Sequence, residues 1–216
     1  MDFGLLIDRI NATSNRIIEI GGKVRELVID EPAREIDILK VEEELGFRLP
    51  YSFRKAMLEF SSNFSFRWFL PDEYSLPDNL RGIFGGTPHL GLDLTVDLDK
   101  ERKEWVENVF FNPHDPYDRV WHNKLAFLSV GNGDYIAFDL NGDEDPPVVY
   151  LSHDDGTGHG YILGNNYIDF LNRWSRLAFV GGEDWQWLPF VANKQDGLNP
   201  NSENAEEFRN SLGLKI

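Results

Sequence analysis

The stretch Leu125–Leu151, LAFLSVGNGDYIAFDLNGDEDPPVVYL, constrains the fold more than any other part of the chain. An apolar run, a Gly-Asn-Gly-Asp corner, an alternating segment and an Asn-Gly pair follow one another, which is the order of a β-meander. In Asp134–Leu140, the apolar residues Ile136, Phe138 and Leu140 share one face, the period-two pattern of a half-buried strand. We therefore expect these three side chains in the core.

The connection after this strand and the strand that follows are also predicted by local signals. Asn141-Gly142 suits a type I′ turn, in which both central residues have positive φ. The continuous apolar run Val148–Leu151 is typical of a strand covered on both faces, and Pro146-Pro147 keeps its start out of a hydrogen-bonded ladder. Together these segments predict a central antiparallel hairpin.

The composition limits the class of protein. The chain has 216 residues, 41% of them hydrophobic, so it is long enough to bury a core without disulfides or a metal. It contains no cysteine, which excludes thiol nucleophiles and cysteine-ligated zinc and fits a reducing compartment. Neither a secretory signal nor an apolar run of about 18 residues is visible, so we expect a cytoplasmic protein.

Charge points to the kind of partner. The formal net charge is −16, which argues against nucleic acid and anionic membranes and favours a basic protein. No Lys or Arg occurs between Leu125 and Asn172. Residues of this basic-free region are candidates for partner binding: Asp134, Asp139, Asp143, Glu144, Asp145, His153, Asp154, Asp155 and His159. An equally good interpretation is that turns collect Asp for local hydrogen bonds and solubility.

Apolar periodicity predicts helices on both sides of the hairpin. Residues 3–28 read as one or two helices, followed by one from Pro32 to Gly46 and one opening at Pro50. The middle of the chain predicts short strands and loops; Leu90–Leu98 is a strand or leads into a helix over Asp99–Val109. Later elements are a helix over residues 167–178, capped by Asn165 or Asn166, and a weak helix over residues 205–212.

Chemical motifs are few. His153, Asp154, Asp155 and His159 form the best constellation for a metal or acid–base site, but their spacing matches no known ligand motif, and the intervening glycines indicate an exposed, flexible loop. The triplet at 139, 141 and 143 imitates the opening of a calcium loop and then fails, with Glu144 where glycine is needed. The glycines of RGIFGGTPHLG lack a phosphate-binding spacing and predict turns. We predict no cofactor and no small-molecule substrate.

Two separated pieces resemble the SUKH superfamily. ILKVEEELGFRLPYSFRKAMLEFSSN, residues 38–63, is similar to its helix, Leu-Gly, Leu-Pro, aromatic, helix and Asn signature. SVGNGDYIAFDL, PPVVYLSHDD and YIDFLNRW resemble, in order, its turn and Gly-Asp-Tyr strand, its Pro-Val-Val-Tyr strand and its closing helix. The resemblance covers residues 32–178, with Asn63-Phe64 where the family usually has Asn-Gly.

The resemblance implies an α+β fold with a mixed or antiparallel central sheet flanked by helices. Together with the segments outside the resemblance, we expect three parts of one globular unit: an N-terminal helical extension (1–30), a SUKH-like domain (31–180) and a C-terminal tail packed on it (181–216). Many bacterial members are immunity proteins against toxins, often nucleases, and fungal relatives regulate cell-wall assembly.

The leading hypothesis is therefore a non-enzymatic immunity protein that holds a cognate toxin through an acidic surface. The alternatives are a regulatory or scaffold protein without a toxin partner, and a metal-dependent hydrolase that uses the 153–159 loop.

Overall fold

The computed structural model describes the backbone of residues 2–216 and all of their side chains except those of residues 87–89. The helices and strands follow one another along the chain in the order α1 (Phe3–Glu19), β1 (Lys23–Ile29), α2 (Glu35–Leu45), α3 (Tyr51–Glu59), β2 (Asn63–Phe69), η1 (Asp78–Leu80), β3 (Gly85–Gly91), α4 (Thr95–Asn108), α5 (Asp118–Trp121), β4 (Lys124–Ser129), β5 (Tyr135–Asp139), β6 (Val148–Leu151), β7 (Ile162–Gly164), α6 (Tyr167–Ser175), α7 (Asp184–Trp187), η2 (Leu188–Phe190) and α8 (Glu203–Leu212). The α+β class predicted from the sequence is confirmed.

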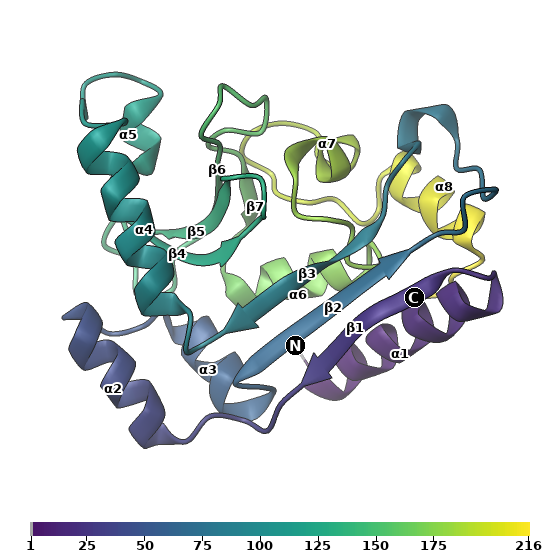
Figure 1. The fold of residues 1–216 in the computed structure, drawn as a ribbon, viewed down its shortest axis with the longest axis horizontal. Coiled ribbons are helices and arrows are strands. Elements are labelled where there is room, and N and C mark those ends of the chain that lie inside the picture. Colours follow the sequence, from purple (N-terminus) through teal and green to yellow (C-terminus); the bar gives the residue numbers. More distant parts are fainter. Residues whose placement is uncertain (1) are drawn as a thin grey trace.

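The strands form two antiparallel sheets, in the orders β1-β2-β3 and β4-β5-β6-β7. Helices α1 and α6 lie behind the three-stranded sheet in Figure 1, and α2 and α4 stand at one side of the molecule. The larger core packs the inner faces of both sheets against α1, α3 and α6. Phe53 of α3 sits at its centre, with ring contacts to Phe127, Phe138 and Tyr167.

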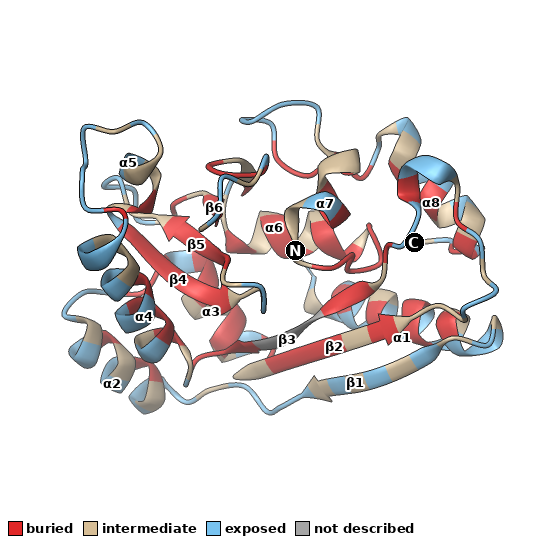
Figure 2. Ribbon diagram, turned by 45° about the horizontal axis from the view of Figure 1, so that its top comes forward, coloured by how far each residue is buried: buried red, intermediate tan, exposed pale blue. Residues whose placement is uncertain are grey.

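A second core covers the other face of the four-stranded sheet. Tyr135, Ala137 and Val149 pack there with Trp121 and Phe110, beneath α4 and α5. Strands β4–β6 are consequently buried on both faces (Figure 2). The prediction for Val148–Leu151 is confirmed, whereas the prediction of a half-buried strand before it is wrong, because small and aromatic side chains let both faces pack.

Two local predictions fail in the first third and at the hairpin. Residues 23–29 form strand β1, not a helix, because Gly21-Gly22 ends α1 and β2 supplies an antiparallel partner. Asn141-Gly142 is not a type I′ turn: Gly142 has a positive φ of 91° but Asn141 does not, and residues 140–147 form a longer connection. The prediction of turns for the glycines of RGIFGGTPHLG holds at Gly82, which lies in a turn with a φ of 82°. It fails at Gly85, which lies in β3 and where a Cβ would stand 1.9 Å from the Trp68 indole nitrogen.

The helices of the central region are confirmed with shifted ends. Helix α2 begins three residues after Pro32 and ends at Gly46, whose φ of 80° favours glycine. Helix α4 begins at Thr95, earlier than expected, and the Asn166 side chain caps α6 by accepting from the Asp169 N–H at 2.8 Å. Helix α6 ends at Ser175, short of residue 178, and the following Ala178 and Phe179 take left-handed conformations.

The C-terminal segment contacts distant parts of the chain. The Leu212 carbonyl oxygen accepts a hydrogen bond from Arg16 of α1 at 2.6 Å, and the Ser211 carbonyl accepts one from the Tyr74 hydroxyl. Phe208 of α8 packs on Phe190 with 5.5 Å between ring centroids. Among the described residues, no helix is both long enough and apolar enough to cross a bilayer.

Candidate protein-interaction surface

The hairpin separates the predicted binding residues into two groups. In the antiparallel register, Tyr135 pairs with Leu151 and Phe138 with Val148. Asp134 and the 153–159 loop therefore lie at one end of the hairpin, and residues 143–145 lie at the other. A five-residue strand such as β5 spans about 17 Å, so the structure does not bring the two groups together.

Asp134 is a buried structural residue. It is 2% exposed, and its carboxylate accepts hydrogen bonds from the Tyr150 hydroxyl, from the backbone N–H and Nδ1 of His153 (2.9 and 2.7 Å), and from Asn132. Burial acts to raise the pKa of Asp134, but the hydrogen bonds from Tyr150 and His153 outweigh it and lower the pKa. Its assignment as a surface contact is corrected, because no partner can reach the carboxylate.

His159 is buried as well, at 7% exposure. Its Nδ1 accepts the Ser152 backbone N–H at 3.0 Å, so the proton of the neutral ring lies on Nε2, which donates to the Tyr117 carbonyl oxygen at 3.1 Å. The ring also stacks on Tyr117 with 3.7 Å between centroids, and burial lowers the pKa of His159. The loop that contains it is anchored at this end, contrary to the expectation of an exposed, flexible segment.

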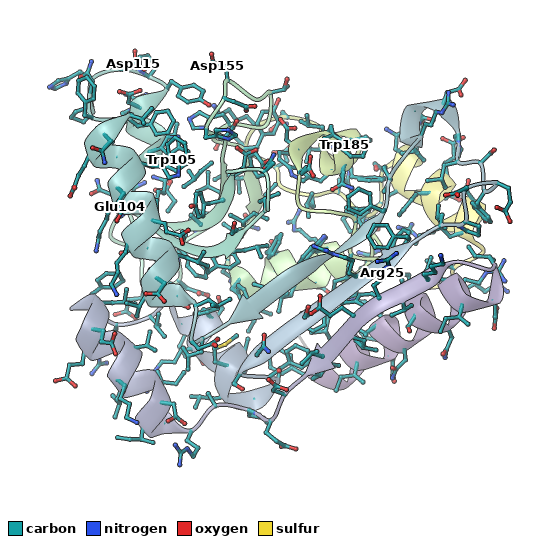
Figure 3. The ribbon with its side chains drawn as sticks, viewed as in Figure 1. Arg25, Glu104, Trp105, Asp115, Asp155 and Trp185 are labelled. Carbon is teal, nitrogen blue, oxygen red and sulfur yellow. The ribbon has the colours of Figure 1, made fainter. Side chains whose placement is uncertain are left out.

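Hydrogen bonds within the protein already engage the best candidate ligands for a metal ion. One ligand atom each from Asp134, His153 and Asp154 lies within 4.8 Å of the others, a spacing that could hold a cation. Both oxygens of Asp134 already accept hydrogen bonds, and Asp154 accepts the Ser152 hydroxyl at 2.9 Å. Protein donors thus engage Asp134 and one oxygen of Asp154, and both ring nitrogens of His159 are engaged elsewhere. Only Asp154 and Asp155 remain exposed; Figure 3 shows Asp155 at the corner that Asp115 also occupies.

At the other end of the hairpin, two acidic residues hold the fold and two are exposed, of which Asp143 accepts the Asp145 N–H at 3.1 Å. Asp139 pairs with Lys124 at 2.7 Å. The Asp145 carboxylate accepts the Ser52 N–H at 2.9 Å, so it satisfies an amide at the N-terminus of α3, where negative charge is favourable. Asp143 and Glu144 are exposed and face outward beside α2.

Helix α2 is the most acidic exposed element beside this loop. The segment from Asp30 to Glu44 contains seven acidic residues and two basic ones. Two apolar residues of α2, Ile36 and Leu39, are 51% and 47% exposed, although the buried stripe of the helix runs through Ile38. Exposed apolar side chains surrounded by charge are typical of protein-binding surfaces.

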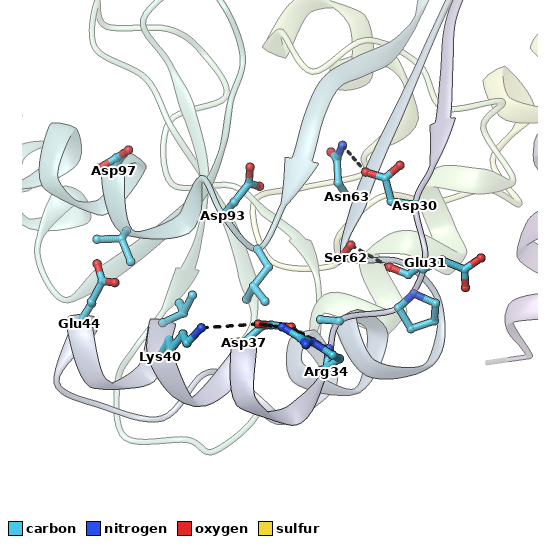
Figure 4. Close-up of a pocket in the computed structure, with 15 residues that line it drawn as sticks. Asp30, Glu31, Arg34, Asp37, Lys40, Glu44, Ser62, Asn63, Asp93 and Asp97 are labelled. Atoms are coloured by element: carbon cyan, nitrogen blue, oxygen red, sulfur yellow. Dashed lines mark hydrogen bonds and ion pairs between the residues drawn. The ribbon is translucent and has the colours of Figure 1, made fainter.

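A groove of about 910 Å³ separates α2 from α4 (Figure 4). Apolar side chains of Val41, Leu92 and Val96 contribute to its lining. Six acidic residues and two basic ones also line it: Asp30, Glu31, Asp37, Glu44, Asp93, Asp97, Arg34 and Lys40. Both basic residues pair with Asp37, at 2.8 and 4.0 Å, and Asp97 pairs with Lys100 at 3.2 Å, so the other four carboxylates give the groove a strongly negative rim.

A second groove, of about 670 Å³, lies on the opposite side of α2. Leu39, Glu35 and Glu42 of α2 line one wall, and Asp143 and Glu144 line the other. Two basic residues, Arg48 and Arg54, also line it, and Arg54 pairs with both Glu35 and Glu42. Tyr51, which is 65% exposed, stands at the start of α3 in the same groove. We call α2, its two grooves and residues 143–144 the acidic ridge.

Sequence reasoning found only Asp143 and Glu144 of the acidic ridge. A signal for α2 was present, because Ile36 and Leu39 fall off the core stripe in the middle of an acidic segment. The opposite wall of the first groove comes from α4, about sixty residues further along the chain, and only the fold places it there.

The α+β fold thus presents one charged ridge that carries exposed apolar residues. A model of the SMI1 / KNR4 family (SUKH-1) matches residues 32–173, well over half of the chain, and the chain belongs to this family. The family comprises immunity and regulatory proteins that bind other proteins and are generally non-enzymatic. No curated protein matches the chain.

Proposed function

We propose that this chain is an immunity protein that neutralises a cognate toxin by holding it on the acidic ridge. The observation that carries the proposal is α2 itself, an exposed helix with two apolar contact residues between two acidic grooves. A toxin that cuts nucleic acid needs a basic groove, and an acidic inhibitor that covers this groove blocks substrate access. For such a toxin the protein acts in the cytoplasm, where the nucleic acid lies.

The electrostatics of the ridge favour rapid capture. Glu31, Glu44 and Asp93 form no ion pair with any residue that the structure describes, and all three are exposed. Their field steers a basic partner and raises its association rate about 10-fold or more at low salt. Ile36 and Leu39 then bury apolar surface on contact, which slows dissociation.

The test is rescue of growth by co-expression with the toxin encoded beside the gene, together with association kinetics at several salt concentrations. Glu31→Gln/Glu44→Gln should slow association and flatten its salt dependence. Ile36→Ser/Leu39→Ser should speed dissociation. The matched control Asp155→Asn/Glu206→Gln removes two exposed charges far from the ridge and should leave both rates unchanged.

Equal effects of the ridge and control pairs would refute the assignment of the surface. Absence of any toxin gene nearby, with wild-type protein unable to protect cells, would favour the regulatory role that the family also contains.

A further inference from the structure

A pocket of about 570 Å³ lies between the loop after α4, residues 115–118 and the 153–155 loop. We call it the α4–α5 pocket, and it shares no lining residue with the acidic ridge. Figure 3 shows Asp115 and Asp155 at this corner of the molecule. The Asp155 N–H donates to the Tyr117 hydroxyl at 3.0 Å, so the fold ties the third of these segments to the second.

Part of the pocket lining is aromatic and open to solvent. Phe111 is 69% exposed, more than any other large hydrophobic side chain that the structure describes, and Val109 is 46% exposed. Phe110 and Tyr117 also line the pocket, with 5.8 Å between their ring centroids. The face of an aromatic ring carries negative potential, so an exposed ring offers a contact surface to a cation as well as to an apolar group.

Three carboxylates with free oxygens line the same pocket. Asp155 accepts no hydrogen bond from a described residue and pairs with no described cation. Asp115 accepts the backbone N–H groups of Tyr117 and Asp118 on Oδ1 alone, and Asp118 accepts the Asn112 N–H on Oδ2 alone. No Lys or Arg is among the residues that line the pocket. A cation is therefore attracted, and an anion is repelled.

His153 adds an acceptor whose orientation is fixed. Its Nδ1 lies 2.7 Å from the ionised Asp134 carboxylate, so the proton of the neutral ring stays on Nδ1 and Nε2 becomes the acceptor. No described residue donates to Nε2. The His153 side chain is 26% exposed and lines the pocket, so a ligand can reach it. A Cβ at Gly133 would stand 3.0 Å from His153 Cε1, so glycine at that position leaves room for the ring.

We propose that the α4–α5 pocket binds the guanidinium group of an Arg side chain, carried by a protein that docks independently of the acidic ridge. The guanidinium has five donors and no acceptor, which matches carboxylate oxygens and the free Nε2 of His153. Its flat face stacks on Phe111, which an ammonium group does less well. The proposal rests on the protein-binding role of the family but not on the toxin or on the ridge.

Three probes of similar size test the chemistry: N-acetyl-arginine methylamide and its citrulline and lysine counterparts. Citrulline keeps the shape of arginine but has no charge. Titration of the arginine probe into the full-length, ¹⁵N-labelled protein should shift the backbone amide signals of Phe111 and Asp155, with a dissociation constant on the order of millimolar. The other two probes should bind there at least several-fold more weakly. Equal shifts from all three probes, or shifts confined to residues of the acidic ridge, would overturn the proposal.

Two variants separate the charge from the aromatic face. Asp115→Asn/Asp155→Asn keeps an oxygen that can accept from the Tyr117 and Asp118 N–H groups, removes two charges, and should weaken the arginine probe at least several-fold. Phe111→Leu keeps an apolar side chain without a ring and should weaken it about 2–5-fold. The control Asp143→Asn/Glu144→Gln removes two exposed charges elsewhere and should leave the affinity unchanged. A control that weakens the probe as much as the pocket variants would show a response to net charge alone and would overturn the proposal.

The two proposals can fail separately. Asp115→Asn/Asp155→Asn should still protect cells from the toxin, and Glu31→Gln/Glu44→Gln should still bind the arginine probe at Phe111 and Asp155. Loss of toxin protection in the pocket variant, with its melting temperature unchanged, would contradict docking that is independent of the ridge.

Discussion

Glu42 fixes the orientation of the acidic ridge, and its removal gives a sharp test of the structure. The side chain is 9% exposed, and its Oε1 accepts the backbone N–H of Leu49 at 3.1 Å and lies 3.4 Å from Arg54 Nε. Leu49 is itself buried, so Glu42→Ala leaves its N–H without an acceptor. A hydrogen bond to a charged acceptor is worth about 1.5–3 kcal/mol, and a partly exposed ion pair adds about 0–1 kcal/mol.

The expected loss for Glu42→Ala is therefore about 1.5–4 kcal/mol of unfolding free energy. For a protein of this size that corresponds to a fall of roughly 3–16 °C in melting temperature. Urea denaturation followed by circular dichroism measures the free energy directly. Glu42→Gln retains an oxygen that can accept from Leu49 and should lose about 1 kcal/mol or less.

Glu43→Ala is the matched control, because Glu43 is the exposed neighbour on the same helix and its loss should change stability by less than about 0.5 kcal/mol. If Glu42→Ala were as stable as this control, the bridge from α2 to Leu49 would be refuted. If all three variants fell equally, the loss would come from the helix in general and not from the Leu49 hydrogen bond.

Three further predictions concern stability. Burial lowers the pKa of His159 in the folded state, so the unfolded state binds the proton more tightly. The unfolding free energy should therefore fall by up to about 1.4 kcal/mol per pH unit as the pH drops below about 6.5. His159→Gln should flatten that slope in urea titrations from about pH 7.5 to 5.5. Asn166→Ala should cost about 1 kcal/mol by removing the α6 cap, with Asn165→Ala, which is not the cap, as a smaller effect by thermal melting. Phe53→Ala should cost about 3–5 kcal/mol, whereas Tyr51→Ala, at the exposed start of the same helix, should cost less than 1 kcal/mol by urea unfolding.

Local sequence signals predicted those helices and strands whose conformation is determined by residues close together in the sequence. Helices α3 and α6 have a complete apolar stripe with a proline or asparagine at the start, so their existence follows from periodicity and capping. The existence of strand β1 does not follow from the local pattern, because its apolar residues Val24, Leu27 and Val28 also fit a helical face. Pairing with β2, about forty residues away, decides the conformation, and no local pattern contains that information.

The same distinction explains the outcome for the site. Residues 139–159 are close in sequence, but the connection of a hairpin and its two outer ends lie at opposite ends of the paired strands. Residues 143–145 and the 153–159 loop therefore do not share a surface. The first groove required α2 and α4 to meet, which depends on the path of the whole chain between them. The acidic character of α2 and of α4 is visible in the sequence, but the fact that the two helices lie next to each other is not.

Some acidic residues in this protein hold the fold, and others lie on the surface without an ion-pair partner. A count of charges does not distinguish the two groups, but their hydrogen-bond and ion-pair partners do. Asp134, Asp139 and Asp145 each accept from a specific donor, and their negative charge is used to hold the hairpin and the start of α3. Glu31 and Glu44 lie on the rim of a groove with neighbouring carboxylates and no ion-pair partner among the described residues. Like charges gathered in this way repel one another in the isolated protein, and a basic partner relieves that repulsion on binding. The unpaired acids of the ridge, and not the larger number of acids around the hairpin, therefore favour a basic protein as the ligand.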